Sequence, residues 1–353
     1  MRKLFYLMLF FVLILFACSK DDKTVDENKQ KSTDLDNKGE LTETETEEQG
    51  EHIYPLTGLS TDNPVDNRII SVMVNNHTEA RPQSGLSEAD IVFEILAEAK
   101  ITRFLALFQS ELPEVVGPVR SAREYYFDIA NRYDALYVYH GAAGFIDEMI
   151  VNEGVSFLNG STYDNDGHLF KRESFRNAPH NSYVQIDAVY EVAENKGYAT
   201  TTEYEPLPFL DKEEIEAIQG EPAQHIEIVY SDNPMEIVEF DYDAATGKYN
   251  RFNDEEQTTE LDSGDAIAVE NVFIIETHHE VIDDAGRREI DLESGGNAYL
   301  IQKGNVQRVD WQNADGRLIP VKDGQPIGFV PGKTWINVIP SSPSMEESVT
   351  ITN

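Results

Sequence analysis

The chain has 353 residues, of which 40% are hydrophobic, so it can form one large or two ordinary domains with real cores. Acidic residues outnumber basic ones by 65 to 28, and the net charge is −37. This argues against nucleic acid as a partner, because neutralising phosphates needs clustered Lys and Arg. With Cys18 as its single cysteine, the chain has no intramolecular disulfide and no cysteine-rich metal site.

Residues 1–17 are predicted to be a lipoprotein signal peptide. A positive start, Met1-Arg2-Lys3, precedes a nearly unbroken apolar run that ends in Leu15-Phe16-Ala17-Cys18. This run is shorter than the roughly 20 residues that a bilayer span needs, although an uncleaved anchor with an incidental cysteine is the alternative. We therefore predict lipidation of Cys18, which would anchor the chain to the extracytoplasmic face of the cell membrane.

Residues 18–52 are acidic and poor in large apolar side chains, and they are predicted to form a disordered tether. Residues 53–200 are predicted to form a mixed α/β domain. Apolar runs indicate buried strands at 69–74, 91–97 and 102–109, and Glu98–Ile101 is a predicted hairpin turn.

The segment Gly117–Asp128 is predicted to be a turn that leads into a helix. Pro118 suits the first helical position, which would put Arg120 and Arg123 in the first turns and on one face. Cations at a helix N-terminus are disfavoured by about 0.3–1 kcal/mol each. We therefore expect a negative partner opposite them, either protein carboxylates or an anionic ligand.

Further along, a strand at 135–140 is followed by the glycine turn Gly141–Gly144 and a helix at 145–153, an order that puts functional loops at carboxyl ends of strands. Residues 158–181 lack periodicity and are predicted to be a long functional loop. Residues 183–196 are predicted to be a helix.

The composition changes at 201–223, which is a predicted junction. From 224 to 345, strand signals recur at short intervals between turns and predict a mainly antiparallel β domain, a sandwich or a barrel. Residues 346–353 are a predicted tail. The expected fold class is therefore α+β or α/β, with a mixed α/β domain followed by a β domain.

Three polar loops and one strand of the first domain carry an unusual share of arginine and histidine. If they converge, they form a pocket for phosphate, pyrophosphate or carboxylate. Alternatively, the arginines pair with Glu94, Glu98, Glu124 or Asp128, and the histidines only form local hydrogen bonds. The predicted anion-binding residues are Arg81, Arg103, Arg120, Arg123, Arg172, Arg176, His77, His140, His180 and Asn181.

No sequence motif of a metalloprotease, a nucleotide-binding protein or a serine hydrolase is found. Ser121 lies between two arginines, but no base adjoins it in the sequence. We predict no metal, no cofactor and no assigned catalytic residue, with a divalent metal expected only if the protein is an enzyme.

Seven segments form a recognisable pattern along the chain. In order they are Asn75–His77, Ala80–Leu86, Ala89–Glu94, Ile101–Leu105, Gly117–Arg123, Arg176–Asn181 and Pro331–Ile336. Together they resemble the YerB-like lipoprotein family, the group described as domain of unknown function 3048. Lys100 departs from the glycine that this resemblance leads us to expect, and Gly141–Gly144 departs from a pattern of glycine, serine and proline. The resemblance implies a two-domain lipoprotein of Gram-positive type and no established reaction.

Our leading hypothesis is a lipid-anchored protein that binds an anionic cell-envelope ligand through the arginines, with the β domain as a surface for an envelope protein. One alternative is an envelope phosphotransferase or hydrolase that acts on a lipid-linked phosphorylated wall precursor and uses Asp90 or Glu94. The other is a non-catalytic partner in a wall-remodelling complex, whose arginines are all paired.

Overall fold

The computed structural model describes residues 50–231 and 237–353, so the predicted signal peptide, Cys18 and most of the predicted tether lie outside the described residues. Regular secondary structure starts near the beginning of the described part, because His52 belongs to a strand. Within these ranges, no helix has the length and apolar character that crossing a membrane requires.

The largest element of the fold is a mixed sheet of twelve strands. Its strands come from both predicted domains. In order across the sheet they are β23 (Gln325–Pro326), β22 (Arg317–Lys322), β21 (Asn305–Ala314), β20 (Gly296–Gln302), β17 (Asn271–Thr277), β24 (Thr334–Pro340), β4 (Ile91–Leu96), β5 (Thr102–Phe108), β3 (Ile70–Asn75), β7 (Leu136–Tyr139) and β8 (Phe157–Asn159), with β11 (Glu221–Pro222) beside β21.

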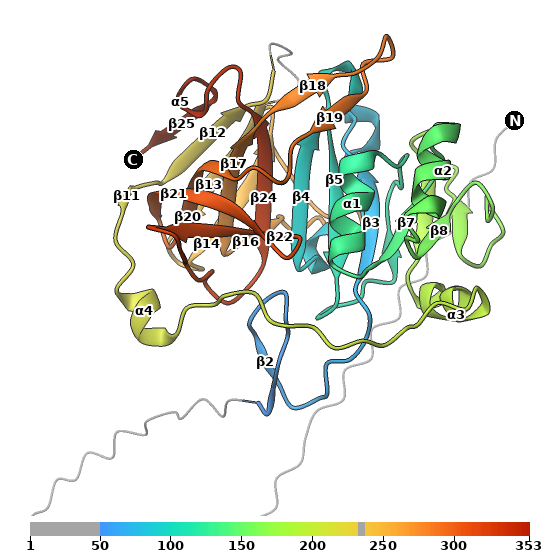
Figure 1. The fold of residues 1–353 in the computed structure, drawn as a ribbon, viewed down its shortest axis with the longest axis horizontal. Coiled ribbons are helices and arrows are strands. Elements are labelled where there is room, and N and C mark those ends of the chain that lie inside the picture. The colour runs from blue at the N-terminus through green and yellow to red at the C-terminus, as the bar shows by residue number, and fades with distance from the viewer. Residues whose placement is uncertain (1–49, 232–236) are drawn as a thin grey trace, which may run out of the picture. The chain divides into compact units, whose positions relative to one another are not determined.

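The parallel pairing of β24 with β4 joins the two predicted domains. Trp335 lies opposite Val92 and Asn337 opposite Glu94 in this pair, and Figure 1 shows β24 and β4 side by side at the middle of the sheet. The expected fold class, with few helices and extensive antiparallel and mixed sheets, is confirmed. The two sequence regions nevertheless share one sheet.

A second sheet of six strands packs on one face of the first. The residues predicted to be a tail, 346–353, contribute to it, because β25 pairs with β12 in antiparallel register. Its strands are β15 (Glu256–Gln257), β14 (Lys248–Asn253), β13 (Ile237–Asp243), β12 (His225–Val229) and β25 (Val349–Thr352), with β16 (Ala268–Val269) beside β14.

Both faces of the twelve-stranded sheet are buried at its centre. In β5, Phe104 and Ala106 belong to the core under the six-stranded sheet, whereas Leu105 and Leu107 belong to the core under the helices. Successive side chains of a strand point to opposite faces. Burial on both faces therefore explains why the central strands read as unbroken apolar runs.

α1, α2 and α3 lie around the strands from the first half of the chain, whereas α4 comes just before β11 and α5 just before β25. Figure 1 shows α1 across the front of β3 and β5. Smaller sheets complete the fold. The helices are α1 (Glu124–Arg132), α2 (Gly144–Asn152), α3 (Asp187–Asn195), α4 (Lys212–Glu216) and α5 (Met345–Ser348), with short 3₁₀ turns at Thr78–Ala80, Leu86–Glu88 and Glu98–Lys100. The small sheets are β1 (His52–Ile53) with β2 (Ser60–Thr61), β18 (His279–Val281) with β19 (Arg288–Ile290), and β9 (Phe170–Arg172), β10 (Ser182–Gln185) and β6 (Val115–Val116) together.

The predicted helix start at Pro118 is wrong. α1 begins at Glu124, with Arg123 as its N-cap, and the preceding residues run extended between other strands. The carbonyl of Pro118 accepts a hydrogen bond from the N–H of Asn75 at 2.9 Å. The backbone groups of this segment find partners far away in the sequence, and local periodicity does not reveal such partners.

Two other elements differ from the predictions. The predicted helix at 183–196 is the strand β10 followed by the shorter helix α3. The predicted loop at 158–181 contains β9 and the end of β8. β8, β9 and β10 are three or four residues long, and β10 pairs with the distant strand β6 as well as with its near neighbour β9, so their own sequences carry little strand signal.

The predicted hairpin between β4 and β5 is confirmed, and its turn shows why a glycine was expected at Lys100. The backbone of Lys100 has a φ of 59°, in the left-handed region that glycine adopts without steric cost. The chain therefore makes the tight turn with a residue that is less suited to it.

A buried ion pair connects the two sheets. Arg251 on β14 donates two hydrogen bonds from Nη2 to Glu94 on β4, at 2.9 and 3.0 Å, and both side chains are at most 1% exposed. The guanidinium lies 4.7 Å from the ring centre of Trp335 and 5.1 Å from that of Phe104. The indole N–H of Trp335 donates to the same carboxylate at 2.8 Å. The pair is thus fully enclosed and hydrogen-bonded.

Arg251→Met should lower the free energy of unfolding by about 3–5 kcal/mol, because it leaves the buried Glu94 charge without its partner. The double change Arg251→Met with Glu94→Leu should recover most of this loss, since neither charge is then buried. Urea denaturation would measure both.

Arg308→Met is the matched control. Arg308 and Glu346 are each 67% exposed, and removal of such a surface pair costs less than about 1 kcal/mol. Equal losses for Arg251→Met and Arg308→Met would contradict the importance of the buried pair.

Asp90 is a second buried charge, at the start of β4. Its Oδ2 accepts hydrogen bonds from the N–H groups of Gln109 and Ser110, at 2.7 and 2.9 Å, and its Oδ1 accepts one from the Ser110 hydroxyl. Burial outweighs these bonds and the charge of Lys333, and raises the pKa of Asp90 to about 6. The ionisation of Asp90 therefore lowers the stability of the folded protein progressively as the pH rises from about 4 to about 6, and the full loss persists above pH 6.

Asp90→Asn should stabilise the protein at pH 7.5, by up to about 3 kcal/mol for two pK units, and change its stability little at pH 4. The amide oxygen can accept both backbone N–H bonds, and the amide nitrogen can donate to the Ser110 hydroxyl. Asp310→Asn, on the exposed face of β21, is the control for the loss of one negative charge. The same stability difference at both pH values would refute this account.

Candidate functional site

Three of the polar loops meet at the backbone of Arg120. Its N–H donates to the carbonyl of Met73 at the end of β3, at 2.8 Å, and its carbonyl accepts from the N–H of His140 after β7, at 3.0 Å. The N–H of Val119 donates to the carbonyl of Ser182 at 2.6 Å. Arg120 therefore lies where the carboxyl ends of two parallel strands and the start of β10 come together.

Gly117 permits this close approach. A Cβ atom at that position would lie 2.7 Å from the Tyr183 ring and 3.0 Å from the carbonyl oxygen of Ser182. A larger residue there would push the Arg120 segment away from β10.

A single carboxylate, that of Glu98, serves two arginines. Arg103 donates to it from Nη2 at 3.0 Å, and Arg123 from Nη2 at 2.7 Å and also from Nε. Burial would raise the pKa of Glu98, but the bond from Arg123 and the charges of both arginines outweigh it and hold this pKa below its usual value. Burial and the charge of Arg123 lower the pKa of Arg103 to about 10.

The guanidinium of Arg120 differs from these two. Among the residues that the structure describes, it has no hydrogen bond and no ion pair, although its side chain is partly buried. Burial and the neighbouring charge of Arg123 lower its pKa. Its charge in turn helps to lower the pKa values of His140 and His180, after burial and closer groups. Arg120 thus lies near both histidines and near the Glu98 cluster, which is formed by Glu98, Arg103 and Arg123.

His140 belongs to a hydrogen-bonded chain with Arg172. Nη2 of Arg172 lies 3.3 Å from Nε2 of His140, and Nδ1 of His140 lies 2.7 Å from the Ser182 hydroxyl. Because arginine can only donate, Nε2 must accept and Nδ1 must carry the proton. Arg172 also bonds to Asp164 at 2.6 Å and to Asn181 at 2.9 Å. This arrangement fits local hydrogen bonding by His140 better than general-base chemistry.

The rings of His77 and His180 lie against each other, with their centres 4.6 Å apart and their planes tilted by 32°. Nδ1 of His180 lies 2.9 Å from the amide nitrogen of Asn75, and Nδ1 of His77 accepts from the N–H of Glu79 at 3.1 Å. Burial, and then the charge of His77, lower the pKa of His180. Two histidines that are far apart in the sequence are therefore neighbours beside the Arg120 segment.

The two remaining predicted arginines have partners of their own. Arg81 pairs with Asp254 at 3.1 Å, and it lines a small cavity of about 240 Å³ between the two halves of the chain. Arg176 donates to the Tyr183 hydroxyl at 2.7 Å and to the carbonyl of Pro82. These contacts tie loops together.

Arg288, in β19, is a member of the cluster that the sequence did not reveal. Its Nε donates to the carbonyl of Ala97 at 3.3 Å, and its pKa responds to the charge of Glu98, although burial has the larger effect and lowers it. A single arginine in the other half of the sequence carries no signal of this position.

Asp90 and Glu94, the acidic residues that the predicted enzyme would use, do not lie in the Glu98 cluster. Glu94 is enclosed in its ion pair with Arg251. Asp90 bonds to Gln109, at the opposite end of β5 from Arg103, and six residues of strand span about 20 Å.

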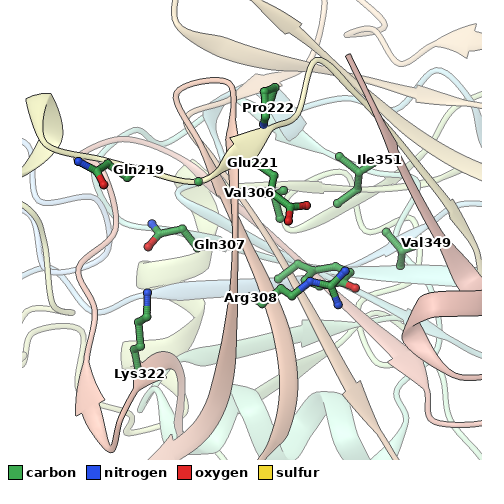
Figure 2. Close-up of a pocket in the computed structure, with 11 residues that line it drawn as sticks. Gln219, Glu221, Pro222, Val306, Gln307, Arg308, Lys322, Val349 and Ile351 are labelled. Atoms are coloured by element: carbon green, nitrogen blue, oxygen red, sulfur yellow. The ribbon is translucent and has the colours of Figure 1, made fainter.

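Another groove, of about 450 Å³, lies in the second half of the chain, between β11, β21 and β25. Figure 2 shows Arg308 and Lys322 along it, with Glu221 above them. None of the predicted anion-binding residues lines it. Arg308 pairs with Glu346 at 3.8 Å, and the carboxylate of Glu221 also lines the groove, so this groove is a weaker candidate for an anion.

Known proteins similar to this chain agree with its architecture. A protein of Bacillus subtilis (strain 168) named "Putative lipoprotein YerB" is 46% identical over 288 residues, which are 81% of this chain and 86% of that protein. The crystal structure of YerB from Bacillus subtilis matches with a TM-score of 0.78 and 44% identity, over 86% of this chain and 100% of that one.

Two regions of the chain match family descriptions. Residues 56–199 match the N-terminal domain of "Protein of unknown function (DUF3048)", and residues 226–336 match its C-terminal domain. The resemblance noted in the sequence is thereby confirmed, and the chain belongs to the DUF3048 family of proteins of unknown function.

Proposed function

We propose that this protein is a lipid-anchored binding protein of the extracytoplasmic membrane face, which binds a phosphate or carboxylate group of a cell-envelope ligand at Arg120. The observation that carries the proposal is the Arg120 guanidinium, which has no described partner inside a cluster of like charges. A partly buried cation without a partner is costly, and an anionic ligand would remove that cost.

The surroundings of Arg120 support an anion rather than a protein carboxylate as its partner. Arg103, Arg120 and Arg123 lie around the one carboxylate of Glu98, which already accepts bonds from two of them. The cluster therefore keeps a positive charge on a chain that is otherwise strongly acidic. A guanidinium presents a planar fork of donors that matches the oxygens of a phosphate or a carboxylate.

The membrane anchor rests on different observations. Cys18 follows a short apolar run in this sequence, and the similar Bacillus subtilis protein is named as a lipoprotein. Acyl chains on Cys18 would hold the folded part at the membrane surface, within reach of envelope ligands.

Arg120→Ala should weaken the binding of pyrophosphate, inorganic phosphate or succinate at least tenfold, because hydrogen bonds to charged groups contribute about 1.5–3 kcal/mol. It should also leave the unliganded protein as stable as before, or more stable, since it removes an unpaired cation. Isothermal titration calorimetry and thermal unfolding would measure the two effects.

Arg81→Ala is the matched control, because Arg81 pairs with Asp254 away from the cluster and should leave binding unchanged. If none of the three anions binds to the unaltered protein, or if Arg120→Ala binds them equally well, the proposed site is wrong.

Glu98→Gln should change anion affinity and stability in the opposite directions from Arg120→Ala. It removes the carboxylate that neutralises Arg103 and Arg123, so the unliganded protein should lose at least about 2 kcal/mol of stability. The cluster gains positive charge, so anion binding should tighten, and saturating pyrophosphate should restore part of the lost stability. Weaker anion binding in a folded Glu98→Gln protein would count against this electrostatic account.

A further inference from the structure

We infer that His77, Glu79 and His180 form a binding site for a divalent transition metal ion such as Zn²⁺. Their possible ligand atoms all lie within 4.8 Å of one another, and Nε2 of His180 is 4.0 Å from a carboxylate oxygen of Glu79. This site is separate from the anion site proposed above, because it uses none of the arginines. The sequence predicted no metal, since His77 and His180 lie in loops far apart along the chain.

The donor set suits zinc. Two imidazoles and one carboxylate are the protein ligands of many zinc sites that keep an open position for water or a ligand. Imidazole nitrogens select Zn²⁺ and its neighbours over Mg²⁺ and Ca²⁺, which prefer oxygen ligands. The three side chains thus favour a transition metal over the hard cations that a merely acidic surface attracts.

The ligands need only a small movement to close on an ion. Zinc–ligand bonds of about 2.0–2.2 Å place tetrahedral ligand atoms roughly 3.3 Å apart, so the atoms must approach by about 1.5 Å at most. The Glu79 side chain is 66% exposed and can rotate to supply this movement. The centres of the two rings are already 4.6 Å apart.

Asn75 holds both histidine-bearing segments in place. This residue is buried at the end of β3, where its Oδ1 accepts from the N–H of His77 at 3.1 Å and its amide nitrogen lies 2.9 Å from Nδ1 of His180. Metal-binding histidines generally have such a partner on the ring nitrogen opposite the metal. Asn75 is the positioning residue of the site.

The protons on the two rings must suit the metal. His180 would bind through Nε2, which needs a proton on Nδ1. Asn75 would have to turn its amide so that the oxygen accepts that proton, and this turn gives up the bond that the oxygen accepts from the His77 N–H. His77 would bind through Nδ1 in place of its bond to the Glu79 N–H. A carboxylate at position 75 needs no such turn, so Asn75→Asp should tighten metal binding.

The test is calorimetric titration of the protein with ZnCl₂ in excess Mg²⁺, which occupies weak carboxylate sites, together with the visible absorption of bound Co²⁺. We expect one ion per chain. Glu79→Gln and His180→Ala should each weaken binding by more than tenfold. Glu79 is exposed, so Glu79→Gln should not affect folding. His168→Ala is the matched control, because His168 and Glu191 form an exposed pair at 3.5 Å.

The absence of one-to-one binding would overturn this inference, and so would zinc binding that Glu79→Gln and His180→Ala leave unchanged. Arg120→Ala distinguishes the two sites. It should weaken anion binding at least tenfold but leave zinc binding equal or tighter, because a nearby positive charge is removed.

Discussion

The buried ion pair between Glu94 and Arg251 is the interaction on which the rest of the structure depends. Two opposite charges in a dry interior tolerate almost no displacement, because each is costly without the other. The pair therefore determines how the six-stranded sheet sits on the twelve-stranded sheet. Its influence extends to the candidate site. The Thr102 hydroxyl donates to Glu94 at 2.8 Å and accepts from the Asn76 amide at 2.8 Å. Thr102 directly precedes Arg103 in the sequence, and Asn76 directly precedes His77.

The candidate site shows how a strongly acidic chain keeps a local positive charge. One carboxylate, on a tight turn between β4 and β5, faces several guanidinium groups from three parts of the chain. It is enough to hold the arginines together but not enough to neutralise them. If Arg120 binds an anion as proposed, this arrangement sacrifices some stability for a pre-organised binding site, a common relation between stability and function. The expected alternative, in which the arginines only pair with acids, describes Arg103 and Arg123 but not Arg120.

Local pattern predicted the parts of the fold that depend on local chemistry. The central strands, their hairpin and the strand–glycine–helix order around β7 are strong signals, because burial on both faces and a tight turn each need particular residues. The errors occurred where the pairing is distant. Pro118 and Arg120 looked helical beside a true helix, and β10 and β25 looked like a helix and a tail. β10 and β25 are short strands, and the segment of Pro118 and Arg120 is extended with isolated bridges; the backbone bonds of all three are formed with residues far along the chain.

The sequence by itself determined the family, the fold class and the set of polar residues that deserved testing, because motifs, apolar periodicity and residue type are local properties. It could not decide which of these residues meet. The tertiary structure assigned Glu98 to Arg103 and Arg123, left Arg120 without a described partner, brought Arg288 into the cluster and placed His180 beside His77. The physical reason is that charge pairing and metal-ligand geometry depend on distances of a few ångströms between distant segments, and these distances follow only from the packing of the two sheets.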